Sequence, residues 1–267
     1  MTIADFLRST TQQLEAAGIA TARLDTQVLL ERTLKQNKAW LLAHGDEEID
    51  AEKLATLQAQ AQRRAAREPL AYILGRQEFY GRVFAVTPSV LIPRPETEAM
   101  IEELKTLPVP DNASVLDVGT GSGAIAITAE LELPHLRTEA CDVSAAALAI
   151  AEQNAERMGA QVTFFESNLL ARAEHSYDVI LANLPYVAED WERSPETNFE
   201  PRLALFAVDA GLELIKKLVT QAPQLLNENG YLLLEADPRQ FAHIKQAAAP
   251  AFTHVRSNGF TIILQKN

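Results

Sequence analysis

Apolar residues recur at two different spacings along the chain, and the change from one to the other divides the sequence. In residues 1–68 they return every three or four positions, as at Ile3, Phe6 and Leu14, which predicts helices. Four helices are expected, over residues 2–17, about 24–34, 39–42 and 50–67, with Pro69 stopping the last. Residues 1–68 are therefore predicted to form a small helical domain.

The spacing changes after Pro69. Aromatic and β-branched residues lie on both sides of Gly81 in the segment 78–86, which predicts a β-hairpin within a linker of residues 69–90. From residue 91 onward, short apolar runs alternate with helical patterns, as expected for a mostly parallel sheet covered by helices. The expected elements are a helix ending near 107, strand 115–118, helix 123–131, strand 136–142, helix 144–158, strands 162–166 and 177–182, helix 210–227, strand 231–235, helix 238–248 and strands 252–256 and 259–264. Gly259 suggests that the last two strands form a hairpin, which would place one antiparallel strand in a seven-stranded mixed sheet.

A glycine-rich turn follows the first strand of that sheet. Val115 to Val118 enters it and Gly119-Thr120-Gly121-Ser122-Gly123 forms it, directly before a helical run. Strand, tight glycine turn and helix are typical of the first unit of a Rossmann-like nucleotide-cofactor fold. The spacing GxGxG differs from the dinucleotide fingerprint GxGxxG, and such a triplet alone is also common in ordinary turns.

Two further features lie at the ends of later strands. Asp142 follows the second strand, 19 residues after Gly123, where an acid can accept both hydroxyls of a ribose. It could equally cap the helix that begins near Ser144, or do both. Asn183-Leu184-Pro185-Tyr186 follows the apolar run 179–182. This combination resembles the class I S-adenosylmethionine (SAM) methyltransferases, and N-[PL]-P-Y resembles those that methylate a planar amide or amino nitrogen.

A third motif narrows the resemblance. Leu91-Ile92-Pro93-Arg94-Pro95-Glu96-Thr97-Glu98 precedes the glycine turn, and Gly75-Arg76-Gln77-Glu78-Phe79, Phe199-Glu200-Pro201 and Gly211-Leu212 lie at matching places. In order and spacing, these segments are similar to the protein-(glutamine-N5) methyltransferases of peptide chain release factors, the HemK/PrmC family. The similarity extends along nearly the whole chain.

The resemblance implies a class I SAM-dependent methyltransferase domain over residues 91–267 and a substrate-docking role for residues 1–68. It implies methyl transfer from SAM to the side-chain nitrogen (N5) of the glutamine in the Gly-Gly-Gln motif of release factors. The implied cofactor-binding residues are Asp117, Gly119, Thr120, Gly121, Ser122, Gly123, Asp142, Asn168, Leu169 and Asn183. The implied catalytic and substrate-binding residues are Asn183, Leu184, Pro185 and Tyr186.

The acceptor chemistry can be argued from the residue types. The Asn183 side-chain oxygen and the Leu184 carbonyl can accept the two hydrogens of an amide NH₂, and Tyr186 can stack on the flat group. Leu184 departs from the commoner Asn-Pro-Pro-Tyr, but a residue before proline is still held in extended geometry, so its carbonyl should keep its direction. Asn168-Leu169 departs from the acid and aromatic residue of relatives. Asn168 can still accept from the adenine amino group, whereas the stacking partner is missing.

Composition weighs against other functions. Residues 91–267 carry 13 Lys and Arg against 25 Asp and Glu, which disfavours direct binding of nucleic acid. The open alternatives are a nucleic-acid amino N-methyltransferase and a SAM-binding module without activity. The single Cys141 excludes an internal disulfide and, beside the ribose acid, is badly placed for carbon-5 cytosine methylation. No signal peptide, membrane span or metal-ligand spacing is expected, and the protein is predicted to be cytoplasmic.

Overall fold

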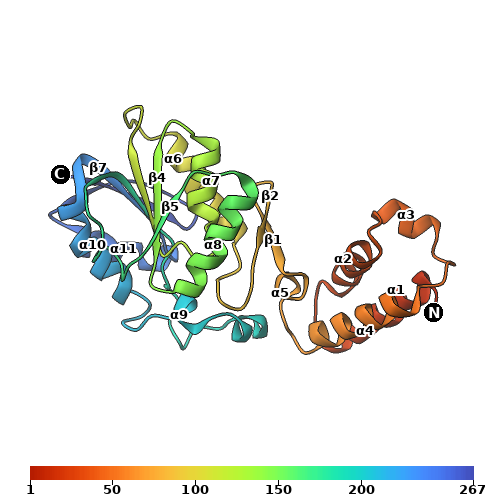
Figure 1. Cartoon of the computed structure of the whole chain (residues 1–267). Helices are drawn as coiled ribbons and strands as arrows, with labels where there is room; N and C mark the ends of the chain where they lie inside the picture. Colours follow the sequence, from red (N-terminus) through yellow and green to blue (C-terminus); the bar gives the residue numbers. More distant parts are fainter. The chain divides into compact units, whose positions relative to one another are not determined.

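By their internal contacts, the residues fall into two units in the computed structural model, which describes residues 1–267 (Figure 1). The first contains Met1–Gly75 together with Arg193–Phe199, and the second contains Arg76–Glu192 together with Glu200–Asn267. The first unit thus extends beyond the expected boundary at residue 68. The hairpin belongs to the second unit, and a segment that follows the Asn-Leu-Pro-Tyr motif belongs to the first.

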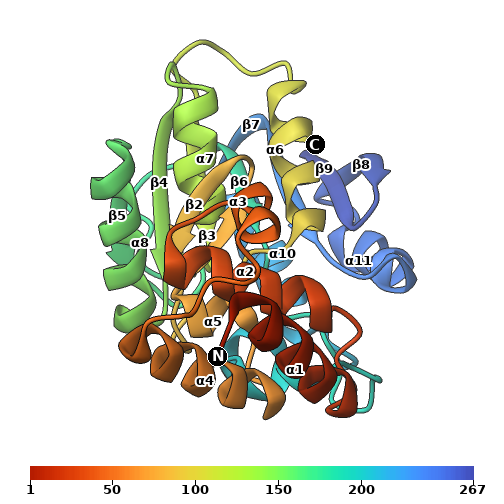
Figure 2. The ribbon, with the colours of Figure 1, turned by 90° about the vertical axis from the view of Figure 1, so that its right-hand side faces the viewer.

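The first unit is helical. Its helices are α1 (Ile3–Ala16), α2 (Ala22–Leu34), α3 (Lys38–Ala43), α4 (Ala51–Ala65) and α5 (Leu70–Leu74), and residues 195–199 add the 3₁₀ helix η2 (Pro195–Phe199). Asp50 caps α4, since its carboxylate accepts from the amides of Glu52 and Lys53. The helices α1, α2 and α4 enclose a core that includes the fully buried Leu29, Leu30 and Leu57 (Figure 2).

A buried ion-pair network lies in this helical unit. Arg64 Nε donates to Asp25 at 2.7 Å, and both side chains are only 7% exposed. Arg64 Nη1 and Arg67 Nη2 bind the carboxylate of Glu196 at 3.0 and 2.8 Å. Burial raises the pKa of Glu196, but hydrogen bonds from Ser194, Arg67 and Arg64 prevail and hold it at about 2. The network fixes residues 193–199 to the helices.

The second unit contains a hairpin and a seven-stranded sheet. The hairpin pairs β1 (Arg76–Phe79) with β2 (Arg82–Ala85). The sheet has the order β5-β4-β3-β6-β7-β9-β8. Its strands are β3 (Ser114–Val118), β4 (Arg137–Asp142), β5 (Thr163–Glu166), β6 (Tyr177–Ala182), β7 (Leu226–Glu235), β8 (Phe252–Asn258) and β9 (Thr261–Lys266). The helices are α6 (Glu98–Lys105), α7 (Ala124–Glu132), α8 (Ala145–Met158), α9 (Arg202–Leu205), α10 (Glu213–Leu225) and α11 (Phe241–Ala248), with the 3₁₀ helices η1 (Pro95–Thr97) and η3 (Pro238–Gln240).

Alternating side chains cover the two faces of the sheet. Along β7, Leu232 and Leu234 belong to one hydrophobic core, which also takes residues of α10 and α11. Leu233 belongs to the other core, which takes residues of α6, α7 and α8. Successive residues of a strand point to opposite faces, so a continuous apolar run is buried on both sides. Helices α10 and α11 lie side by side against one face (Figures 1 and 2).

The predicted seven-stranded mixed sheet is confirmed. Strand β9 pairs antiparallel with both β7 and β8, while the pairs from β3 to β7 are parallel. Strand β7 begins at Leu226, five residues before the expected Tyr231, but only Tyr231–Glu235 pairs with β9. The segment between β6 and α10 contains the short helices η2 and α9.

Removing the buried guanidinium should destabilise the helical unit. Arg64→Ala leaves Asp25 as a buried carboxylate without a cation, which costs about 3–5 kcal/mol. The control is Arg8→Ala, because Arg8 forms an exposed pair with Asp5 and its removal should change the unfolding curve little. Urea unfolding followed by circular dichroism measures both. Equal midpoints for the two variants would contradict the prediction.

Candidate functional site

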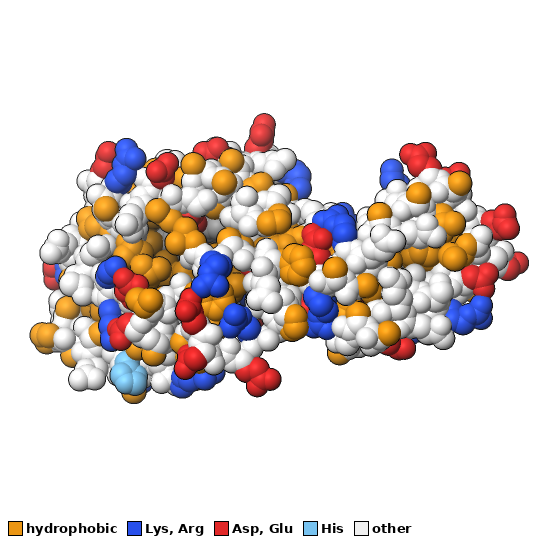
Figure 3. All heavy atoms as spheres, turned by 90° about the horizontal axis from the view of Figure 1, so that it is seen from below, with side chains coloured by type: hydrophobic (Ala, Val, Ile, Leu, Met, Phe, Trp, Pro, Cys, Tyr) orange, Lys and Arg blue, Asp and Glu red, His pale blue; other side chains and the backbone are white.

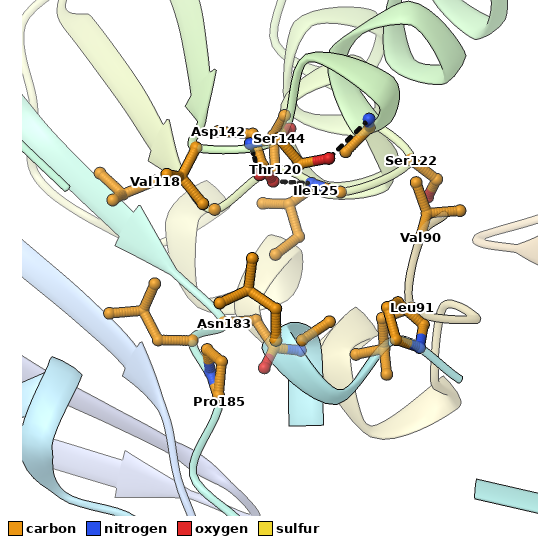
Figure 4. Close-up of a pocket in the computed structure, with 18 of the residues that line it drawn as sticks. Val90, Leu91, Val118, Thr120, Ser122, Ile125, Asp142, Ser144, Asn183 and Pro185 are labelled. Atoms are coloured by element: carbon orange, nitrogen blue, oxygen red, sulfur yellow. Dashed lines mark hydrogen bonds between the residues drawn. The ribbon is translucent and has the colours of Figure 1, made fainter. Parts of the chain in front are cut away.

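A cavity of about 320 Å³ lies at the carboxyl ends of strands β3 to β6, within the second unit. Ten of the residues predicted for the site line it: Gly119, Thr120, Gly121, Ser122, Asp142, Asn168, Leu169, Asn183, Leu184 and Pro185. Asp142, Thr120 and Ser144 lie on one side of the cavity and Asn183 and Pro185 on the other, with Val90 and Leu91 on a further side (Figure 4). The cavity therefore brings together ten of the thirteen residues predicted for the site.

The glycine turn is held against the neighbouring strand. The amides of Gly119 and Thr120 both donate to the carbonyl of Cys141, at 2.8 and 3.0 Å. Gly119 has φ +76°, and a Cβ there would lie 3.0 Å from Leu184 Cδ2. The positive φ strains any residue with a side chain at this position, and the close contact shows that the turn lies against the Asn-Leu-Pro-Tyr segment.

Two of the expected cofactor residues lie outside the wall. Asp117 is fully buried beneath the turn, where its Oδ2 accepts from Thr120 Oγ1 at 2.6 Å and from the Ala126 amide at 3.2 Å. Burial raises the pKa of Asp117 to about 7 against these two hydrogen bonds, and its Oδ1 has no partner. A Cβ on Gly123 would lie 2.7 Å from Ile127 Cδ1, inside helix α7. Asp117 and Gly123 thus shape the turn, whereas the other residues of the turn line the cavity.

Asp142 binds the backbone on both sides of the cavity edge, at the glycine turn and at the start of α8. Its Oδ2 accepts from the Gly121 amide and its Oδ1 from the Ser144 amide, each at 2.9 Å. Ser144 is the residue that caps α8, through a bond from the Ala147 amide. Each carboxylate oxygen can accept more than one bond, so the half-buried Asp142 retains acceptor capacity toward the cavity for a ribose.

The part of the site expected to bind adenine is formed by Asn168 and Leu169 and contains no aromatic side chain from these two positions. Asn168 is exposed in the wall, and its side chain forms no hydrogen bond within the protein. Leu169 is only 8% exposed and has a left-handed backbone, φ +52°. Its carbonyl accepts from Ser167 Oγ at 2.8 Å. The residues fit an adenine held by one amide and by aliphatic contact.

The acceptor segment begins where β6 ends. Asn183 Nδ2 donates to Thr97 Oγ1 at 3.1 Å, while Asn183 Oδ1 and the Leu184 carbonyl have no partner in the protein. The Leu184 side chain is 4% exposed and packs against Gly119. The sequence had suggested a role only for the carbonyl of Leu184. Two free acceptors therefore stand at the cavity, as an NH₂ group requires.

Tyr186, which was expected to stack on the acceptor, does not line the cavity. Its carbonyl accepts from Gln240 Nε2 at 2.9 Å, and its hydroxyl donates to Glu235 Oε1 at 3.3 Å. A Cβ on Gly211 would lie 2.0 Å from the Tyr186 carbonyl oxygen, so only glycine fits there. Two segments distant in sequence, one at Gly211 and one at residues 235–240, thus pack against Tyr186 and bind it.

Sequence reasoning missed the partners of these residues. Thr97 and Arg94 belong to the Pro-Arg-Pro-Glu-Thr segment, whose individual side chains received no role. Arg94 is the one Lys or Arg lining the cavity, and it forms an ion pair with Glu200, which also accepts from the Ile92 amide. Glu235 could have been noticed in the sequence, because it is an acidic residue at the end of an apolar strand.

Several other chemistries find no support. No group of His, Cys, Asp or Glu side chains is arranged to hold a metal ion. Cys141 is fully buried, and burial together with Asp117 raises the pKa of its thiol to about 12, so it is no nucleophile. No helix is both long and apolar enough to span a membrane.

Gly119→Ala should weaken binding of the expected cofactor. The left-handed backbone costs a residue with a side chain about 1–2 kcal/mol, and the new methyl meets Leu184. Because this strain falls on the binding turn, we expect the Kd for SAM to rise by about tenfold, equivalent to about 1.4 kcal/mol. Gly159→Ala is the control, since Gly159 has φ +73° with nothing within 4 Å and lies outside the wall. Calorimetry with SAM tests both, and equal affinities would contradict the prediction.

The fold and sequence have known relatives. A methyltransferase structure from Pyrococcus furiosus matches with a TM-score of 0.55 at 19% identity, covering 82% of this chain and 100% of that chain, which shows a shared fold. Residues 5–75 match the PrmC N-terminal domain, and residues 96–197 match the methyltransferase small domain.

Two curated relatives cover most of the chain. The release factor glutamine methyltransferase of Koribacter versatilis is 41% identical over 249 residues, which are 89% of this chain and 89% of that protein. The enzyme of the same name from Geobacter sulfurreducens is 42% identical over 238 residues, 88% of this chain and 84% of that protein. With its class I methyltransferase fold and the motifs at its cavity, the chain belongs to the family of release factor glutamine methyltransferases.

Proposed function

We propose that this protein transfers a methyl group from SAM to N5 of the glutamine in the Gly-Gly-Gln motif of peptide chain release factors. The observation that carries the proposal is the pair of free acceptors at the cavity, Asn183 Oδ1 and the Leu184 carbonyl. A primary amide has two hydrogens on its nitrogen and needs two acceptors to hold them.

The geometry explains how a poor nucleophile reacts. The lone pair of an amide nitrogen is delocalised into its carbonyl and lies perpendicular to the amide plane. Two acceptors in that plane hold both N–H bonds and leave a face of the amide open for attack. SAM supplies the methyl group on a positively charged sulfur, which is already a good leaving group. Proximity and alignment are therefore the main contributions of Asn183 and Leu184. The methylated nitrogen carries one proton too many and loses it to solvent after transfer, so no strong base is needed beforehand.

The cofactor side of the cavity fits the same proposal. The turn 119–122 offers bare backbone, and Asp142 offers acceptor capacity for a ribose.

Methylation of nucleic acid is the rival reaction of an Asn-x-Pro-Tyr segment. The cavity wall contains Arg94 as its one cation, and Glu200 neutralises it. Lys and Arg are interleaved with Asp and Glu on the face seen in Figure 3, where no uniformly basic area is present. Capture of a phosphate backbone needs clustered cations, so the surface favours a protein substrate.

A protein that meets release factors works in the cytoplasm, where a lone buried thiol such as Cys141 stays reduced.

The helical unit is proposed to dock the release factor. It exposes large apolar side chains, with Leu24 57% and Leu42 64% accessible. Such residues contribute to association when a partner buries them. This role adds affinity for the protein substrate, while the second unit holds the reacting groups.

Asn183→Ala tests the acceptor assignment. Losing an aligned polar contact that is used in the transition state costs about a hundredfold to a thousandfold in rate, so single-turnover methylation should fall by that factor. The affinity for SAM should change less. A release factor whose Gly-Gly-Gln glutamine is replaced is the substrate control. Methylation that survives this replacement would disprove the substrate assignment, and an unimpaired Asn183→Ala enzyme would disprove the acceptor mechanism.

The docking role is tested by the double substitution Leu24→Ser and Leu42→Ser. We expect KM for the intact release factor to rise by about tenfold, the equivalent of about 1.4 kcal/mol of lost apolar contact. Turnover of a short Gly-Gly-Gln peptide should stay unchanged, because a peptide needs no second contact. Val255→Ser, on the 39%-exposed Val255 of strand β8, is the matched control. An unchanged KM in the double variant would remove this surface from docking.

A further inference from the structure

A buried carboxylate stands behind the acceptor residues. Glu235 is the last residue of β7 and is 1% exposed. Strand β7 pairs with β6 so that Leu234 lies opposite Ala182, which brings Glu235 beside Asn183. Glu235 does not line the cavity, so a role in the reaction has to pass through its neighbours.

Those neighbours are the residues that form the acceptor site. The Tyr186 hydroxyl donates to Glu235 Oε1 at 3.3 Å, and Oε2 has no hydrogen-bond partner in the protein. Thr97, which is 3% exposed, accepts from Asn183 Nδ2 at 3.1 Å. Thr97, Tyr186 and Asn183 all lie close enough to Glu235 to lower its pKa. Burial nevertheless prevails and raises the pKa of Glu235 above its ordinary value.

The single hydroxyl hydrogen of Thr97 determines which way the Asn183 amide faces. A hydroxyl has one hydrogen, and a carboxylate can only accept. With its hydrogen turned toward the carboxylate, Thr97 must accept from Asn183, which places the nitrogen of the Asn183 amide at Thr97 and leaves the oxygen free. The two ends of an asparagine amide are nearly the same size, so shape alone does not choose between them.

We propose that Glu235 is a positioning residue for methyl transfer, and that its ionised carboxylate orients the Thr97 hydroxyl and thereby the oxygen of Asn183. The same carboxylate holds the hydroxyl of Tyr186, whose backbone continues from the acceptor segment. This inference rests on the proposed function, because it assigns Asn183 Oδ1 to the amide of the substrate glutamine.

If the ionised form of Glu235 is required, the methylation rate should depend on pH. The titratable or charged groups that act on this cluster are Tyr186, Glu96 and Arg94, and Glu96 raises the pKa of Glu235 further. Since the active form is the carboxylate and its pKa is raised, activity should be present above that pKa and lost as the pH falls through it. The acidic limb should therefore lie above the ordinary glutamate value of 4.5.

The test compares Glu235→Gln with wild type in single turnover on a release factor. Glutamine keeps the size of the side chain but removes the charge and brings its own donor. A bond to a charged acceptor is worth about tenfold to a hundredfold, so the rate should fall by that factor while the Kd for SAM changes less than about twofold. The acidic limb of the rate profile should disappear. Glu102→Gln, at an exposed site, should keep both the rate and the limb.

A second variant separates positioning from mere stability. Thr97→Val removes the hydroxyl at nearly constant volume, and if Glu235 acts through Thr97 the double variant should be little slower than either single one. An inactive wild-type protein would contradict the proposed function itself. An active wild type with an equally fast Glu235→Gln, an acidic limb retained in that variant, or fully additive losses would overturn the positioning role and leave the function intact.

Discussion

Hydrogen bonding between strands β3 and β6 is the constraint on which the rest of the site depends. Val118 pairs with Ala182 at the ends of the two strands, although 63 residues of chain separate them. The chain first builds β4 and β5 on one side of β3 and then returns to place β6 on the other. Open parallel sheets bind ligands at such a reversal of strand order. The pairing brings Gly119 against Leu184, so the cofactor turn and the acceptor segment share one cavity.

Pairing alone does not fix the segment beyond β6, and polar clamps supply the remaining order. Gln240 holds the Tyr186 carbonyl, and Gly211 allows the close approach of the backbone. Further along, Glu200 binds Arg94 and the Ile92 amide. Between these clamps the chain contributes residues 193–199 to the helical unit, through Glu196. The segment that carries the acceptor residues is thus covalently continuous with a segment held by the unit proposed to dock the substrate.

The sequence predicted the features that depend on local geometry. The glycine turn, Asp142 and the Asn-Leu-Pro segment follow strands, so an alternating pattern and a parallel sheet were enough to place them at one edge. The roles of Asp117 and Tyr186 were harder to predict, because a residue next to a site in sequence can point beneath it. The roles of Glu235 and Gln240 were not predicted for another reason. Their partners come from distant segments, and only the folded sheet brings those segments together.

The balance of charge in the cavity finally limits what can react there. Arg94 is matched by Glu200, Asp142 remains on the cofactor side, and Glu235 lies behind the acceptor residues. A phosphate would meet no uncompensated cation in this wall, whereas the positive sulfonium of SAM meets no repulsion from a free one. An uncharged amide suits such a site, since its recognition uses oriented acceptors and needs no counter-ion. In the proposed mechanism, recognition of the primary amide therefore depends on which way Asn183 faces.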